Sequence, residues 1–179
     1  MPTEAMIDHP FPTIRAAGLF LMGVGAIFAL GWVFPRRFTL FMGLAFAVGG
    51  FAAYVGYALP PDLGPIRQLD IWVYGLAILA EIVGIALVYR RVEGERAQDA
   101  WMLMVVGAHF LPMVLAFGPA ALALALACMA NAALALRRID QPILPFGLTD
   151  SALKVATGVW LFMAYPTANF ANFANFANA

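Results

Sequence analysis

The segment IWVYGLAILAEIVGIALVY, residues 71–89, contains a single charged residue, Glu81. A helix needs about 20 mostly apolar residues to cross a hydrocarbon core about 30 Å thick. The segment is therefore predicted to be a membrane-spanning helix. It also carries an acid near its centre, and ionisable residues inside a membrane usually have a functional role.

Five other stretches are long and apolar with at most two charges each, namely residues 16–34, 38–59, 100–117, 119–136 and 149–165. Short connections rich in proline, glycine and arginine separate them. Backbone groups in lipid must be hydrogen-bonded internally, so helices are expected. The predicted fold is all-α, a polytopic transmembrane bundle of six helices over residues 16–165. Residues 1–15 form an external N-terminal tail, and residues 166–179 a low-complexity C-terminal tail whose ANF repeat receives no function.

The composition excludes an ordinary soluble domain. Hydrophobic residues make up 64% of the chain and charged residues 11%, against about 45–50% and about 25% in soluble domains. Ten basic and ten acidic residues cancel, so no positive field is available to hold nucleic acid. The single cysteine, Cys128, excludes a disulfide within the chain and any CxxC motif.

Basic residues predict the orientation of the bundle. Eight of the ten cationic residues fall on one predicted side of the membrane: Arg36, Arg37, Arg90, Arg91, Arg96, Arg137, Arg138 and Lys154. Positive residues accumulate on the cytoplasmic side of membrane proteins. We therefore expect a multi-pass protein of the inner (cytoplasmic) membrane with both termini on the non-cytoplasmic side.

Two ionisable residues are predicted to lie at one depth inside the membrane. Glu81 precedes Arg90 by nine residues, and His109 follows Trp101 by eight. A rise of about 1.5 Å per residue places them about 13 Å and about 12 Å from the same interface. A lone charge at the centre of a bilayer costs about 2.5–3.5 kcal/mol. Glu81 and His109 are therefore predicted to face each other.

Two further residues complete this predicted polar site. Pro112 cannot donate a hydrogen bond to the carbonyl of Ala108, so the fourth helix should kink beside His109 and leave that acceptor free. Asn131, in the fifth span, supplies an amide roughly one turn nearer the cytoplasm.

Two interpretations of this site stay open. In the structural interpretation, Glu81 and His109 are a buried pair that sets the register of two helices, and Asn131 makes a second polar contact between helices. In the functional one, they line a polar path and exchange a proton, since histidine changes its charge most readily near neutral pH. The second interpretation predicts proton-linked transport or binding of a small molecule. The alternative is a non-catalytic accessory subunit of a larger membrane complex that organises lipid, pigment or partner helices.

Lys154 is predicted to be a secondary feature near the cytoplasmic interface. Asp150 precedes it by four residues, a favourable order for an ion pair on a helix. Thr149, Asp150 or Ser151 can cap the sixth helix, and the ammonium group can extend to the interface. The other possibility pairs Lys154 with Glu81, although their predicted depths differ by several ångström.

Common catalytic motifs are missing from the sequence. There is no HExxH, GxSxG or phosphate-binding glycine loop. Cys128 lies in a wholly apolar helix, where a thiol is usually inert. No catalytic residue is predicted, an enzyme is disfavoured, and zinc lacks enough ligands. One cofactor is left open, a haem or chlorophyll-type pigment held by His109 as a single axial ligand.

Small residues indicate close helix packing. Ala45, Gly49 and Ala53 recur at four-residue spacing in the second span, which lets backbones approach closely. The expected partners are the lipid bilayer and either a second copy of the chain or another membrane subunit.

The segment GAHFLP, residues 107–112, resembles a G-x-H-F-x-P pattern of small, uncharacterised multi-spanning bacterial membrane proteins. The resemblance covers six residues of one helix. It implies that His109 and Pro112 act together, and it lends no activity.

Overall fold

The chain folds into helices throughout the part that the computed structural model describes, residues 11–59 and 63–163. The ANF repeat and most of the two predicted tails lie outside these residues. The elements are α1 (Ile14–Val33), the 3-10 turn η1 (Pro35–Arg37), α2 (Phe38–Ala58), α3 (Gln68–Arg91), α4 (Glu95–Ala108), α5 (Val114–Phe117), α6 (Pro119–Arg137) and α7 (Leu144–Met163). The predicted all-α class is confirmed, with no strand in the described ranges.

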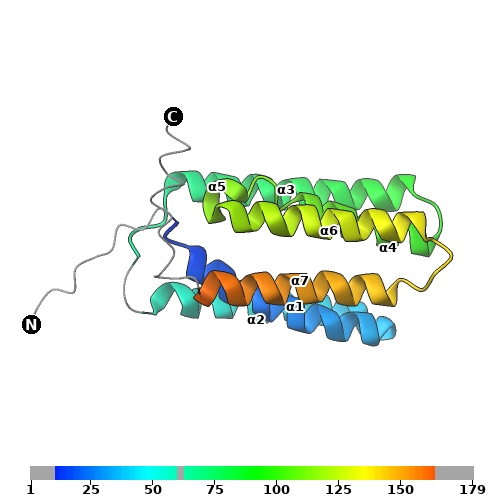
Figure 1. Cartoon of the computed structure of the whole chain (residues 1–179), viewed down its shortest axis with the longest axis horizontal. Helices are drawn as coiled ribbons and strands as arrows, with labels where there is room; N and C mark the ends of the chain where they lie inside the picture. The colour runs from blue at the N-terminus through cyan, green and yellow to red at the C-terminus, as the bar shows by residue number, and fades with distance from the viewer. Residues whose placement is uncertain (1–10, 60–62, 164–179) are drawn as a thin grey trace, which may run out of the picture.

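The helices form two layers that lie side by side. One layer contains α3, α4, α5 and α6, and the other contains α1, α2 and α7 (Figure 1). Within the second layer α1 packs against both α2 and α7, while α6 packs against α7 and joins the layers. By contrast, α2 and α3 do not pack closely against each other. One side of the bundle, between α2 and α3, therefore lacks close helix packing in the described part of the chain.

Glycines allow α1 to approach its two neighbours. A Cβ added at Gly18 would lie 2.8 Å from the carbonyl oxygen of Gly158 on α7, and one at Gly25 would lie 2.8 Å from that of Ser151. On the opposite side, a Cβ at Gly23 would lie 3.4 Å from the Cα of Gly49 on α2. Small residues at such seams allow close van der Waals contact, a main source of helix association in lipid.

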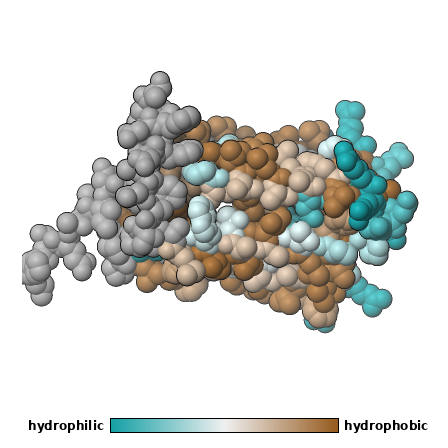
Figure 2. Space-filling model, in the orientation of Figure 1, coloured by the Kyte–Doolittle hydropathy of each residue, from teal (hydrophilic) through white to brown (hydrophobic). Residues whose placement is uncertain are grey.

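The outer surface is strongly apolar along the length of the helices (Figure 2). Large hydrophobic side chains on α2 and α3 are widely exposed, including Phe51 at 70% and Trp72 at 63%. Four helical segments are long and apolar enough to cross a membrane, namely Ile14–Val33, Pro35–Ala58, Gln68–Arg91 and Pro119–Arg137. The structure is therefore compatible with an integral membrane protein.

Arginines gather at one end of the bundle. The connections that follow α1, α3 and α6 all lie at this end (Figure 1), where Figure 2 shows hydrophilic residues together. The turn η1 carries Arg36 and Arg37, and the last turns of α3 and α6 carry Arg90, Arg91 and Arg137.

Several helix boundaries differ from those expected from the sequence, and α4 begins at Glu95 instead of residue 100. The last helix begins at Leu144 instead of residue 149, because a proline such as Pro145 is tolerated in the first turn of a helix. The fourth predicted span is broken, since α4 ends at Ala108 and α5 begins at Val114. The prediction that the carbonyl oxygen of Ala108 is a free acceptor is also wrong. This oxygen accepts a hydrogen bond from the backbone N–H of Leu111 at 3.0 Å.

Candidate functional site

A cavity of about 540 Å³ lies between the two layers, on the side where α2 and α3 do not pack together. Its walls are mostly aromatic and aliphatic. Three acidic or basic side chains also line it, namely Glu81, His109 and Lys154. Tyr54 and Ile78 also line it and are themselves 70% and 51% exposed. The cavity therefore reaches the outer surface between α2 and α3. Its volume lies within the range of about 300–1,000 Å³ typical of small-molecule sites.

Glu81 and His109 approach each other inside this cavity. The Oε2 atom of Glu81 lies 3.8 Å from Nδ1 of His109, and the two side chains are 17% and 11% exposed. That distance is too long for a hydrogen bond. Instead, Nδ1–H of His109 donates to the carbonyl oxygen of Val106 at 2.6 Å. The carboxylate of Glu81 makes no hydrogen bond to any residue within the described ranges.

The break in the fourth span positions the imidazole. His109 follows the last residue of α4, and its backbone N–H still donates to Val105 at 3.0 Å. The next residues form turns up to Met113 because Pro112 has no N–H to continue the helical ladder. The imidazole packs on the ring of Phe110, with centroids 4.1 Å apart. His109 and Pro112 are thus part of one local structure.

Lys154 does not reach the interface, and that prediction is wrong. Its side chain is 1% exposed, and Nζ donates to Oδ2 of Asp150, which is equally buried. The correction follows from the earlier start of α7: Lys154 lies ten residues after Leu144, or about 15 Å along the helix. Asp150 accordingly pairs with Lys154 and does not cap the helix.

Lys154 and Glu81 lie at the same depth. Glu81 precedes Arg91, the last residue of α3, by ten residues, again about 15 Å from the arginine-rich end. The sequence predicted a difference of several ångström. Lys154 lines the same cavity as Glu81 and His109. It forms its ion pair with Asp150, however, and none with Glu81 among the described residues.

Asn131 belongs to a different part of the bundle. Its side-chain amide donates to the carbonyl oxygen of Phe146 at 2.8 Å, which links α6 to the first turns of α7. It does not line the cavity. The structure therefore separates Asn131 from Glu81 and His109.

Some polar residues of the cavity were not among the predicted site residues, including Thr13 and Tyr74. Thr13 Oγ1 and Tyr74 Oη form a hydrogen bond near the end of the cavity opposite the arginines. The ring of Tyr74 stacks on Phe117, with centroids 5.5 Å apart. Tyr74 is seven residues before Glu81, so helical periodicity places it on the same face. The sequence contains no comparable signal for Thr13.

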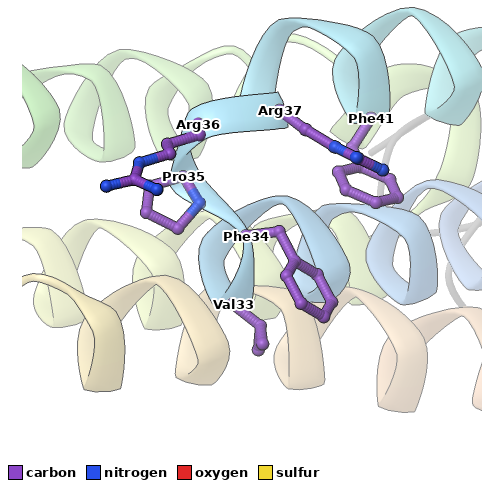
Figure 3. A pocket seen from close by; sticks show the side chains of 6 residues that line it. All are labelled: Val33, Phe34, Pro35, Arg36, Arg37 and Phe41. Atoms are coloured by element: carbon purple, nitrogen blue, oxygen red, sulfur yellow. The ribbon is translucent and has the colours of Figure 1, made fainter.

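A second hollow of about 760 Å³ lies at the turn η1. Arg36 and Arg37 point in different directions there, away from each other (Figure 3). Val33 and Phe34 are about half exposed at 49% and 52%. Because its charged groups do not converge, this hollow is a feature of the outer surface and not a candidate site. No cluster of three metal-binding side chains occurs in the described residues.

Comparison with known proteins assigns the chain to a family. The model of a family of unknown function, DUF6609, matches residues 4–171. The chain belongs to DUF6609. No curated protein and no solved structure gives a significant match. Membership of DUF6609 brings no activity with it.

Proposed function

We propose that this chain is a six-span membrane protein that binds a small apolar molecule in the cavity between α2 and α3, and couples its movement to a proton at Glu81. The six spans are α1, α2, α3, the broken α4–α5 segment, α6 and α7. One observation carries the proposal: an acid with no hydrogen-bond partner among the described residues lines an apolar cavity of ligand size.

The position of the cavity supports an exchange with the bilayer. Its mouth lies between two helices whose outer faces carry exposed apolar side chains. An apolar molecule dissolved in the hydrocarbon could enter sideways without crossing a polar surface. Buried ionisable residues that line a cavity usually mark substrate or proton pathways.

The arginine-rich end supports a specific orientation. Positive residues favour the cytoplasmic side, so η1 and the ends of α3 and α6 would face the cytoplasm. The start of α1 and the end of α7 would then lie on the non-cytoplasmic side. The same reasoning favours the cytoplasmic membrane.

Proteoliposomes loaded with a pH-sensitive dye test this function. Small apolar compounds of three classes, neutral, anionic and cationic, are added outside, and the change of internal pH is recorded. At least one class is expected to move protons through the wild type but not through Glu81→Gln. Glu95→Gln is the matched control because Glu95 lies in the exposed first turn of α4.

The alternative, an accessory subunit, predicts a different result. In that case no class of compound would change the internal pH, although the protein would be folded and correctly inserted. Thermal unfolding of each variant in detergent separates loss of folding from loss of exchange.

A further inference from the structure

The charges around the cavity do not balance when Glu81 is ionised. Lys154 and Asp150 form a buried ion pair, so their charges cancel. The imidazole of His109 uses its Nδ1–H for the carbonyl of Val106, which a neutral ring can do. The remaining titratable groups of the lining, Tyr54, Tyr57 and Tyr74, are neutral phenols, and α1 contributes no charged residue to it. With His109 neutral, Glu81 is thus the one charged group among the described residues of the lining that has no oppositely charged partner.

An uncompensated carboxylate in an apolar cavity has two ways to avoid the cost of burial. It can carry a proton, or it can stand beside a cation. Lys154 does not serve as that cation, because its ammonium group donates to Asp150. These surroundings therefore favour a protonated Glu81. A cation that enters can take the place of the proton.

The aromatic rings that line the cavity suit an organic cation. Phe20, Phe28, Phe46, Tyr54, Tyr74 and Phe117 line the cavity from α1, α2, α3 and α5. Aromatic faces attract cations, most strongly where water is excluded. The ammonium group of Lys154 already lies 5.9 Å from the ring centre of Phe28. An anion would meet the carboxylate instead, and a neutral molecule would make no use of it.

We propose that the cavity binds a monovalent lipophilic cation against Glu81 in exchange for one proton. This inference rests on the proposed function and names the class of its substrate. The exchange is balanced: the carboxylic acid of Glu81 loses its proton to solvent, and the carboxylate pairs with the entering cation. No covalent bond to the ligand forms, and the net charge of the cavity stays at zero before and after.

Binding of tetraphenylphosphonium to the purified protein in detergent tests the exchange. Calorimetry in two buffers with different ionisation enthalpies counts the protons released. The wild type is expected to release one proton for each cation. Its affinity should rise by up to about tenfold for each unit of pH, as expected when one proton competes with the ligand. Glu81→Gln should lose both the proton release and the pH dependence, while Glu95→Gln keeps them.

Two additional measurements make the result decisive. Triphenylphosphine oxide, a neutral molecule of similar shape, should bind more weakly than the cation and release no proton. Glu81→Asp keeps the charge and should retain proton release with reduced affinity. If Glu81→Gln fails to fold, the proton count of the wild type still tests the proposal.

The inference and the proposed function fail in different ways. Equal binding of the neutral and cationic probes without proton release would overturn the cation exchange and leave a small-molecule site intact. Absence of binding by both probes, together with no response in proteoliposomes, would overturn the proposed function as well.

Discussion

Replacement of Lys154 by methionine is expected to destabilise the bundle severely, and additional replacement of Asp150 by leucine is expected to restore most of the loss. Lys154→Met keeps the length and apolar stem of the side chain but removes its charge. The carboxylate of Asp150 would then stay buried without its partner. In the double variant both charges are absent, so no buried charge would be left without a partner.

The burial of the pair decides the expected magnitude. Exposed ion pairs contribute about 0–1 kcal/mol. The side chains of Lys154 and Asp150 are only 1% and 2% exposed, so the values for buried pairs apply. Removal of one partner of a buried pair costs about 3–5 kcal/mol, whereas replacement of both by apolar residues is often close to neutral. The two single substitutions should therefore be non-additive by at least about 3 kcal/mol.

The assay is unfolding by sodium dodecyl sulfate in mixed micelles, followed by circular dichroism for the wild type, both single variants and the double variant. Arg91→Met serves as the control, because Arg91 is an exposed cation at the end of α3; it should change the free energy of unfolding by less than about 0.5 kcal/mol. A cost of less than about 1 kcal/mol for Lys154→Met would refute the reasoning, since it would mean that the amine reaches water.

Three further outcomes are expected. Gly158→Ala should destabilise the protein by about 1–3 kcal/mol because its Cβ would lie 2.6 Å from the carbonyl oxygen of Gly18. The matched control is Gly75→Ala, whose Cβ would have nothing within 4 Å. It should stabilise the protein by up to about 1 kcal/mol in the same unfolding assay. Asn131→Leu should cost about 0.5–1.5 kcal/mol through its lost hydrogen bond and leave proton exchange in proteoliposomes unchanged, so a loss of exchange would return Asn131 to the site. Burial, and to a smaller degree the nearby Glu95, raises the pKa of Asp99 near the start of α4. The folded state therefore binds this proton more tightly than the unfolded state, and the stability gained below the unfolded pKa is lost as pH rises through the folded pKa; Asp99→Asn should flatten this decline in thermal unfolding measured across pH, and an unchanged slope would contradict it.

The candidate site was partly accessible to sequence reasoning. Depth along a helix follows from counting residues, and this argument selected Glu81 and His109, which the structure places 3.8 Å apart. The same counting misplaced Lys154, because it assumed that the last helix begins after Pro145. Proline is compatible with a first turn as well as with a connection, so the sequence alone left the boundary ambiguous by five residues, from Leu144 to 149. That shift moved Lys154 from the interface to the level of Glu81.

Hydropathy is a local property, and it determined what the sequence could determine by itself: long apolar helices, the arginines at their ends and one acid within residues 71–89. The rotation of each helix about its axis and the identity of its neighbours are not local properties. The contact of Gly18 with Gly158 joins α1 to α7, which lie near opposite ends of the sequence. The lack of close packing between α2 and α3 opens the cavity. Only the tertiary structure decided these contacts. In lipid, helices associate through the close fit of their small-residue faces, because apolar surfaces alone do not distinguish one helix from another.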